Sequence, residues 1–230
     1  RHCIKGHRIM MRENISLIID FDDTLVDVNA AKVILENYEK EFYSEKSNLY
    51  KKKQINFRQY QEESFIKVLE KNSIESLQLY SKNNVKIRNG FDRLIKYTCL
   101  NNINVTILSS GLKLYIEPVI KNYMSKINLI ATDILTEDNI IKFSYNDAFD
   151  KDCSPKWGIC KCKIVESMKK TNYLIYVGDG VTTDFSASSK CDTIYALEPL
   201  YSKCLSENIE VQKFISFDNL IKGIMKLKGQ

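Results

Sequence analysis

The stretch Ser16-Leu-Ile-Ile-Asp20-Phe-Asp-Asp-Thr24 decides the fold of this 230-residue chain. Its first half is a short, continuous apolar run that ends in acidic residues, a pattern typical of a strand buried on both faces. Similar runs recur at residues 104–108, 129–131, 173–177, 193–196 and 213–216. The sequence therefore predicts a sheet of buried strands, the first of which ends at Asp20.

Helical patterns lie between these strands, at residues 91–100, 112–124, 161–170, 184–189 and 219–228. Strands that alternate with helices favour a parallel sheet with helices on both faces. We therefore expect an α/β fold with a Rossmann-like parallel sheet. Ligands of such sheets bind beyond the carboxyl ends of the strands, which is where the acidic residues of the first stretch lie.

One segment, residues 28–87, breaks the alternation. It is polar, rich in Glu, Lys, Tyr and Asn, and shows no convincing strand, and a structureless loop of this length is uncommon inside a compact domain. Its apolar residues fall at helical spacing: Ile34, Leu35, Tyr38 and Phe42, then Phe65, Val68 and Leu69. We therefore predict a helical cap at residues 28–87, inserted into a core made of residues 1–27 and 88–230.

Composition narrows the class of protein. Hydrophobic residues make up 44% of the chain, so disorder and fibrous repeats are excluded. Basic side chains outnumber acidic ones by 34 to 29 and are spread along the chain, and the triplet Lys51-Lys-Lys53 fits a solvated helix face better than a nucleic-acid site. No apolar run reaches the roughly 18 residues of a membrane span, and the basic segment from Arg1 to Asn14 lacks the apolar core of a signal peptide.

The seven cysteines lack regular spacing, which fits reduced thiols better than a disulfide framework. We therefore expect a cytoplasmic protein that binds neither nucleic acid nor membrane. The net charge of +5 suits a small anionic substrate, and the oligomeric state stays open. Cys153, Cys160 and Cys162 lie close in sequence, but without a Cys-x-x-Cys pair an incidental role is favoured over a soft-metal site.

Asp20 and Asp22 follow the first predicted strand, two residues apart. One carboxylate could attack as a nucleophile while the other transfers a proton, with a metal ion screening their mutual repulsion. Such a pair could equally cap the following helix or bind a cation structurally. A second acidic segment, Gly178-Asp179-Gly180-Val-Thr-Thr-Asp184, follows a later strand, and its two Asp could complete an oxygen-rich Mg²⁺ site with Asp20. A turn with a helix cap is the alternative for that segment.

Two further pieces fit the same edge of the sheet. In Ile107-Leu-Ser-Ser-Gly111 a strand ends in hydroxyl groups before a helix, so Ser109 and nearby backbone N–H groups could hold a phosphate oxygen. Lys161 or Lys163, at the start of a later helix, could supply the cation that a phosphate and two carboxylates need. Each piece alone is weak, but four in this order indicate one phosphate-handling site.

With these four motifs the sequence resembles the haloacid dehalogenase superfamily of phosphatases over almost the whole chain. The resemblance implies that Asp20 attacks phosphorus, and that Asp22 protonates the leaving group, activates water and places its backbone carbonyl on Mg²⁺. Thr24 would steady this loop. Ser109, with Ser110 and Gly111 beside it, and Lys161 would bind the phosphoryl group. Asp179 would bind Mg²⁺, and Asp184 would hold the metal's water or the lysine.

Within the superfamily the chain is similar to the phosphoserine-phosphatase-like branch, and to its phosphoethanolamine/phosphocholine and methionine-salvage members. The Cys160-Lys161 pair favours Lys161 over Lys163 as the family lysine. Phosphoserine phosphatases carry a Glu near the position of Asn29, and its absence here weakens a phosphoserine assignment. Asp27 and Asn29, at the hinge into the cap, are the candidates for contacting the leaving group. Aromatic cap residues are expected to be core rather than a substrate cage; they include Tyr38, Phe42, Tyr60 and Phe65.

The sequence thus favours a Mg²⁺-dependent phosphatase that hydrolyses a small phosphorylated metabolite through an aspartyl-phosphate. A phosphotransferase or mutase that uses the same intermediate is one alternative. A non-catalytic protein that senses a phosphorylated ligand is another, although a mere binder has no need of the second carboxylate of the Asp20 and Asp22 pair. Sequence indicates the reaction far better than it indicates the alcohol on the other side of the phosphoester bond.

Overall fold

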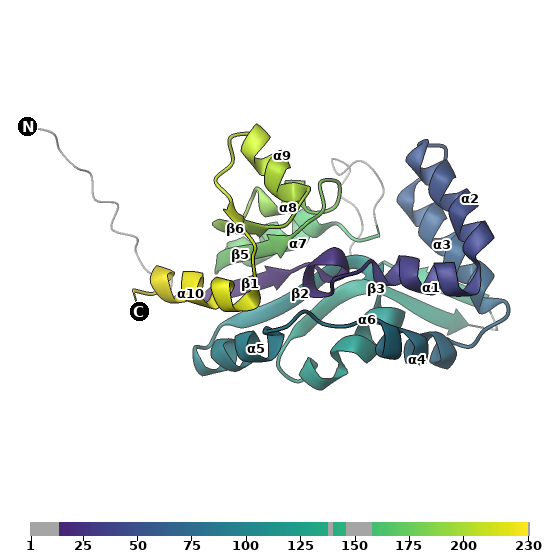
Figure 1. Ribbon diagram of the computed structural model, residues 1–230, viewed down its shortest axis with the longest axis horizontal. Helices are drawn as coiled ribbons and strands as arrows, with labels where there is room; N and C mark the ends of the chain where they lie inside the picture. Colours follow the sequence, from purple (N-terminus) through teal and green to yellow (C-terminus); the bar gives the residue numbers. More distant parts are fainter. Residues whose placement is uncertain (1–13, 138–139, 146–157, 230) are drawn as a thin grey trace, which may run out of the picture.

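The computed structural model describes residues 14–137, 140–145 and 158–229. In these ranges the strands form one seven-stranded sheet with the order β4-β3-β2-β1-β5-β6-β7 (Figure 1). The strands are β1 (Ile15–Ile19), β2 (Asn104–Leu112), β3 (Asn128–Glu137), β4 (Ile140–Ser144), β5 (Tyr173–Gly178), β6 (Thr193–Ala196) and β7 (Gln212–Lys213). All neighbours pair in parallel except β3 and β4. The predicted α/β fold with a Rossmann-like parallel sheet is confirmed.

Ten α-helices accompany the sheet in the described residues: α1 (Ala30–Tyr38), α2 (Lys40–Lys51), α3 (Phe57–Leu69), α4 (Ile74–Asn84), α5 (Phe91–Leu100), α6 (Lys113–Ile120), α7 (Lys161–Lys169), α8 (Phe185–Ser188), α9 (Leu200–Ser206) and α10 (Phe217–Leu227). Figure 1 shows α5, α6 and α10 on one side of the central strands and α7, α8 and α9 on the other. The sheet is therefore covered on both faces, as expected.

The central strand β1 explains why its sequence is a continuous apolar run. Leu17 and Ile19 belong to the large hydrophobic cluster on one face of the sheet, and Ile18 belongs to the smaller cluster on the other face. All three side chains are fully buried. Because successive side chains of a strand point to opposite faces, a strand covered on both sides needs apolar residues at every position.

Two elements were not predicted. The edge strand β4 pairs antiparallel with β3, and its residues alternate between exposed and half-buried, so it lacks the buried run that marks the central strands. The short helix α9 buries only Leu200 and Cys204, one helical turn apart. Both elements lie toward the margins of the fold, where weaker burial leaves a weaker sequence pattern.

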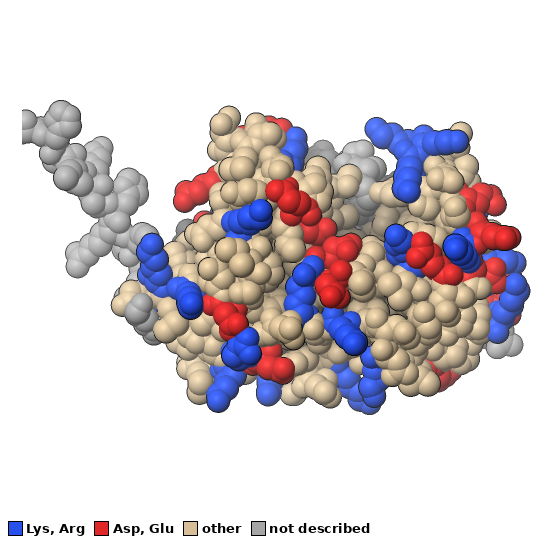
Figure 2. Space-filling view, viewed as in Figure 1, with Lys and Arg blue, Asp and Glu red and all other residues tan. Residues whose placement is uncertain are grey.

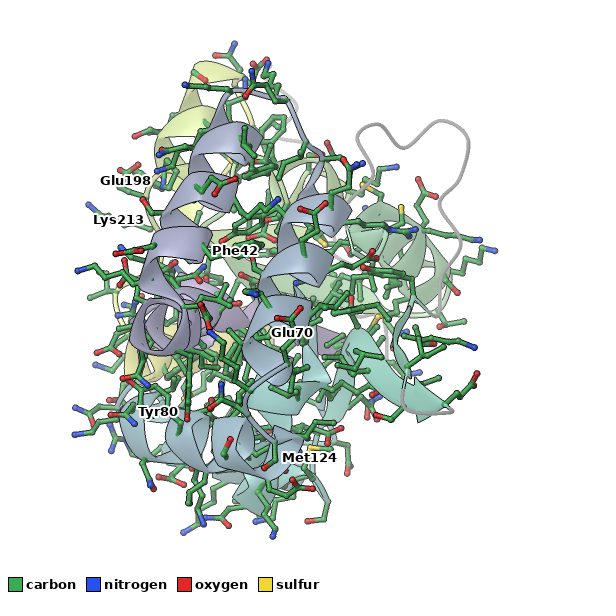
Figure 3. The ribbon with its side chains drawn as sticks, turned by 90° about the vertical axis from the view of Figure 1, so that its right-hand side faces the viewer. Phe42, Glu70, Tyr80, Met124, Glu198 and Lys213 are labelled. Carbon is green, nitrogen blue, oxygen red and sulfur yellow. The ribbon has the colours of Figure 1, made fainter. Side chains whose placement is uncertain are left out.

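Between residues 28 and 87 the regular elements are the helices α1, α2, α3 and α4. Figure 3, which faces this end of the molecule, shows α2 and α3 side by side. A single antiparallel bridge between Val26 and Ile87 joins the two points where the chain leaves and re-enters the rest of the fold. Buried residues of this segment, such as Ile34 and Phe65, belong to the same hydrophobic cluster as the central strands. The division into a core and a cap stays a prediction.

The surface carries both signs of charge. On the face shown in Figure 2 basic and acidic side chains are interspersed, and the surface is hollowed between the α8–α9 end and the α2–α3 end. Within the described residues, no helix has both the length and the apolar character needed to cross a membrane.

Candidate active site

The chain turns sharply after β1, and this turn carries the first acidic motif. The Asp20 amide donates to the Val177 carbonyl of β5 at 2.9 Å, which continues the sheet to the position of Asp20. Asp23 adopts a left-handed backbone with a φ of 56°, a conformation that non-glycine residues adopt infrequently but Asp tolerates better than most. Arg88 holds the turn from outside by donating to the backbone carbonyls of Asp23 and Thr24, both at 2.9 Å.

Lys161, the first residue of α7, reaches the end of β1. Its ammonium donates to Asp20 Oδ1 at 2.5 Å and to Asp184 Oδ1 at 2.6 Å, and the residue is only 3% exposed. The neighbouring candidate Lys163 is exposed on the same helix. Of the two lysines that sequence left open, Lys161 is therefore the one that lies among the acidic residues.

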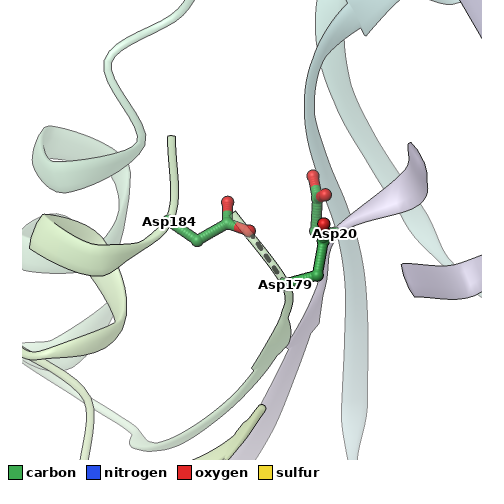
Figure 4. A group of neighbouring side chains, drawn as sticks. All are labelled: Asp20, Asp179 and Asp184. Atoms are coloured by element: carbon green, nitrogen blue, oxygen red, sulfur yellow. Dashed lines mark hydrogen bonds between the residues drawn. The ribbon is translucent and has the colours of Figure 1, made fainter. Parts of the chain in front are cut away.

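The loop after β5 brings two more carboxylates to the same place. Oxygen atoms of Asp20, Asp179 and Asp184 all lie within 4.8 Å of one another. Figure 4 shows the three side chains together. Thr24 is fully buried and donates to Asp179 Oδ1 at 2.9 Å. Three carboxylates at this distance, each offering hard oxygen ligands, form a cluster of the kind that binds a divalent cation.

The three carboxylates are not equivalent. Asp184 Oδ1 accepts from Lys161 and from the Tyr176 hydroxyl at 2.9 Å, and Oδ2 accepts from the Gly180 amide at 2.9 Å and more weakly from that of Asp179 at 3.3 Å. Both oxygens are thus already used in holding the lysine and the loop. Asp20 and Asp179 are therefore better placed than Asp184 to offer an oxygen directly to a cation.

The electrostatics of the cluster show an excess of negative charge. Burial, and then repulsion from Asp184, raise the pKa of Asp179 to about 6 and that of Asp20 well above its usual range, even though Lys161 opposes the shift at Asp20. Burial alone would lower the pKa of Lys161, but the Asp184 and Asp20 carboxylates outweigh it and raise that pKa. The lysine therefore stays charged, and one lysine does not neutralise three carboxylates. A divalent cation would restore the balance.

Asp22 lies in a different environment from Asp20. Its Oδ1 accepts from the backbone amide of Ala30, at the start of α1, at 2.7 Å, and its Oδ2 lies 3.5 Å from the Tyr115 hydroxyl. Burial is the main cause that raises the pKa of Asp22 to about 7. A carboxyl group that holds its proton near neutral pH is suited to donate that proton and take it back.

The acidic residues open onto a pocket that encloses about 680 Å³ of empty space, part of it open to solvent. Ser109, Ser110 and Gly111 line it where β2 ends, and the Ser109 hydroxyl accepts from the Gly111 amide at 3.0 Å. A Cβ at Gly111 would lie 2.1 Å from the Tyr115 hydroxyl oxygen. Glycine at this position is therefore required by the close approach of the tyrosine.

Asn29 and Asp27, the two predicted contacts of the leaving group, lie in different surroundings. Asn29 lines the pocket and also caps α1, since its side chain accepts from the Lys32 amide at 2.9 Å. Asp27 is exposed and is not among the described residues that line the pocket. Cys160 is buried and Cys162 is half-buried. Cys153 lies outside the described residues.

Sequence reasoning missed much of the opposite wall of the pocket. Tyr60 and Phe65, expected to be core residues, line it together with Phe57 and Gln61 from the same helix. Positions 57, 61 and 65 are spaced four residues apart and position 60 follows 57 by three, which places them on one face of α3. That spacing was a usable signal, but the sequence alone does not show that this face points toward Asp20.

Comparisons with known proteins agree with this geometry. No family model matches the chain. A 2-hydroxy-3-keto-5-methylthiopentenyl-1-phosphate phosphatase of Bacillus cereus is 23% identical over 219 residues, which cover 94% of this chain and 99% of that protein. A phosphoserine phosphatase structure described as a phospho-aspartyl intermediate analogue superposes with a TM-score of 0.64 at 18% identity, over 91% of this chain and 98% of the other. A substrate-bound phosphoserine phosphatase gives 0.63, also at 18% identity, over 91% and 97%.

The fold and the site define an α/β protein that gathers two aspartates of the β1 turn, a buried lysine and an acidic loop at the carboxyl edge of a parallel sheet. This is the haloacid dehalogenase type of architecture, shared with the phosphoserine phosphatases above. The chain therefore has the fold of the phosphoserine phosphatases and is similar over 94% of its length to the Bacillus cereus phosphatase.

Proposed function

We propose that the protein is a Mg²⁺-dependent phosphatase that hydrolyses a small phosphomonoester through an aspartyl-phosphate on Asp20. The observation that carries the proposal is the contact between Lys161 and Asp20 in a pocket that also holds Asp22 and Asp179. The named phosphatase activities of the relatives support the same reaction class and a small phosphorylated substrate. A cytoplasmic location fits such a substrate.

In the first half of the reaction an Asp20 oxygen attacks phosphorus and the bond from phosphorus to the leaving oxygen breaks. Asp22 donates its proton to that oxygen, so the product leaves as a neutral alcohol. In the second half Asp22 takes a proton from water, whose oxygen attacks phosphorus and releases phosphate from Asp20. The pKa of Asp22, raised to about 7, suits it to both tasks near neutral pH.

Asp20 and Asp179 would hold Mg²⁺ directly, with the backbone carbonyl of Asp22 as a further ligand and Asp184 acting through a bound water or through Lys161. The carboxylate cluster carries negative charge that Lys161 does not compensate, which favours a cation at this site. Because both oxygens of Asp184 already accept hydrogen bonds, the direct ligands would come from Asp20 and Asp179. Bound there, the ion supplies electrostatic stabilisation of the charge on the transferring phosphoryl group.

The remaining residues would orient the phosphate. Lys161 offers a fixed positive charge, and Ser109, Ser110 and Gly111 line the pocket beside it with hydroxyl and backbone groups. Thr24 would act through Asp179, to which it donates a hydrogen bond, rather than on the phosphate itself. Residues 28–87 would form a cap that covers the substrate and excludes water, with Asn29 at its hinge; Asp27, although exposed, stays a candidate for contact with an incoming substrate.

The test is hydrolysis of an aryl phosphate by the purified protein with Mg²⁺. We expect turnover that chelation of the metal abolishes, and an Asp20→Asn variant that keeps its circular dichroism spectrum but loses activity by at least about 10³-fold. Activity that survives Asp20→Asn would remove Asp20 as the nucleophile. Transfer of phosphate to an added alcohol in preference to water would favour the transferase alternative, and tight binding of phosphate esters without turnover would favour the sensor.

A further inference from the structure

Two residues that line the pocket, Gln61 and Ser110, carry buried side-chain oxygens without a partner. Among the residues that the structure describes, five buried side-chain oxygens accept or donate no hydrogen bond: Gln61 Oε1, Ser64 Oγ, Ser110 Oγ, Thr132 Oγ1 and Tyr195 Oη. Four of the five come from α3 and from the neighbouring strands β2 and β3. Native proteins leave few buried polar atoms unpaired, because such an atom has lost the hydrogen bonds that water would supply. Of these residues Gln61 and Ser110 line the pocket, where a bound ligand can supply the missing partner.

Gln61 is the best defined member of this group. It is only 3% exposed, it lines the pocket, and its Nε2 donates to the Ser110 carbonyl at 3.2 Å. This bond sets the orientation of the amide, because the reverse orientation would bring two carbonyl oxygens together. The remaining group, Oε1, is then an acceptor that needs an O–H or N–H donor.

The part of the pocket wall that α1 and α3 form is largely apolar and, in the described residues, carries no charged side chain. The pocket residues from α1 and α3 are Ala31, Leu35, Phe57, Tyr60, Gln61 and Phe65. Within the described part of the chain, these helices thus bring no carboxylate and no cation to the pocket. Among the described residues that line the pocket, Lys161 is the one cation, and it is already bound to Asp20 and Asp184. An amino-acid leaving group would find no partner for its carboxylate on this wall.

A quaternary ammonium fits the aromatic side chains but not Gln61. Several rings around the pocket could face such a cation, yet a quaternary ammonium has no N–H to donate to Oε1. A neutral alcohol with a hydroxyl group meets both demands, since its carbon chain can lie against Phe57, Tyr60 and Phe65 while its hydroxyl donates to Gln61. Asp23, a lining carboxylate that the proposed reaction does not use, has Arg88 and Lys32 as opposing charges and a hydrogen bond with the Asn29 side chain.

We infer that the leaving group is a neutral, partly apolar alcohol that carries a further hydroxyl, and that Gln61, supported by Ser110, is the residue that selects it. This inference rests on the proposed phosphatase function and deepens it. A site built to pair with a hydroxyl discriminates strongly against the analogue that lacks it, because its own polar group is then left buried and unpaired.

The experiment compares five phosphate esters with Mg²⁺: 2-hydroxybutyl phosphate, butyl phosphate, phosphoserine, phosphocholine and an aryl phosphate. For the wild-type protein we expect kcat/KM on the hydroxybutyl ester to exceed that on each of the other three alkyl esters by at least about 10-fold. In Gln61→Met, which keeps the length of the side chain and removes both polar groups, the ratio of hydroxybutyl to butyl ester should fall by about 10-fold or more. Gln54→Met, at an exposed position of the same segment, should leave the ratio unchanged.

The outcomes separate the two proposals. If no ester is hydrolysed, the aryl phosphate included, the proposed function fails. If the aryl phosphate is hydrolysed but the hydroxyl gives no advantage, or phosphoserine or phosphocholine is preferred, the inference about Gln61 is wrong while the phosphatase function stands. It is also wrong if Gln61→Met lowers kcat/KM on both butyl esters equally with an unchanged melting temperature, because that result shows that Gln61 does not distinguish the hydroxyl.

Discussion

One wall of the pocket consists of charged side chains and the other of neutral, mostly aromatic ones. The wall formed by the ends of β1, β5 and α7 holds Asp20, Asp179 and Lys161, all tied by hydrogen bonds of 2.9 Å or less. The wall formed by α3 presents rings and one amide, with Gln61 in place of any charge. The difference separates two tasks. Charges fixed by short contacts suit a reaction on phosphate that is the same for every ester, whereas a neutral surface decides which alcohol is accepted.

The largest effect is expected from Lys161→Met, which attacks the charged wall. The substitution leaves Asp20 and Asp184 buried without their cation, and breaking a buried ion pair costs about 3–5 kcal/mol. We expect the free energy of unfolding to fall by about that amount and kcat on an aryl phosphate to fall by at least about 10³-fold. Chemical denaturation and steady-state kinetics at saturating Mg²⁺ measure the two effects.

Lys163→Met is the matched control, since this lysine is exposed two residues further along the same helix. It should change neither stability nor kcat by more than experimental error. Equal losses in the two variants would mean that the charge of the helix, and not the contact with Asp20, matters.

Asp22→Asn should show an effect that depends on the alcohol. An alkyl alkoxide is a poor leaving group and needs the proton of Asp22, whereas an aryl oxide leaves readily without it. We expect kcat to fall by about 10²–10⁴-fold on an alkyl phosphate and by clearly less on an aryl phosphate. Equal losses on both substrates would indicate that Asp22 positions the loop through the Ala30 amide and does not act as the acid.

The sequence predicted the residues of the charged wall better than those of the neutral wall. The charged residues follow strands whose apolar runs are easy to recognise, because a strand buried on both faces tolerates few polar side chains. The carboxyl ends of parallel strands meet at one edge, so Asp20, Ser109 and Asp179 could be placed together without a structure. The structure added that Asp184 already accepts four hydrogen bonds, which no spacing reveals.

The neutral wall could not be placed in the same way. The apolar spacing of α3 predicts a helix with a buried face, but Phe65 serves the hydrophobic core and the pocket at once. Whether Tyr60 faces α2 or the active site depends on how the helix packs, and packing angles are not written in local sequence. Arg88 was overlooked for a related reason, because its partners are backbone carbonyls 64 and 65 residues earlier in the chain.

Arg88→Ala should have an intermediate effect. The half-buried guanidinium bonds two carbonyls of the turn that carries Asp22 and joins this turn to the point where the helical segment re-enters the core. Losing both bonds should lower kcat by about 10–100-fold through misplacement of Asp22, with a smaller change in KM. The control is Arg93→Ala, whose solvent-screened pair with Asp218 should contribute little to stability and nothing to kcat. A kcat for Arg88→Ala equal to that of Arg93→Ala would show that the turn holds its shape unaided.

The smallest effect is expected from Tyr60→Phe, and it tests whether the neutral wall is indeed free of chemistry. The Tyr60 ring stacks on Tyr50 with a centroid distance of 5.3 Å, and its hydroxyl is hydrogen-bonded to Tyr43. Burial, followed by the neighbouring Tyr43, raises the pKa of Tyr60, so the hydroxyl stays neutral at any working pH. The substitution keeps the ring and removes one hydrogen bond, which should cost about 1 kcal/mol of stability and change kcat by less than about 3-fold.

Tyr43→Phe removes the other partner of this bond from a residue that is not among those lining the pocket in the described chain. If the hydroxyl of Tyr60 only supports packing, the two variants should lose similar stability and the double variant should lose little more than either alone. A fall of kcat in Tyr60→Phe of more than about 10-fold, absent from Tyr43→Phe, would give the hydroxyl a part in catalysis. The division between a charged wall that reacts and a neutral wall that selects would then no longer hold.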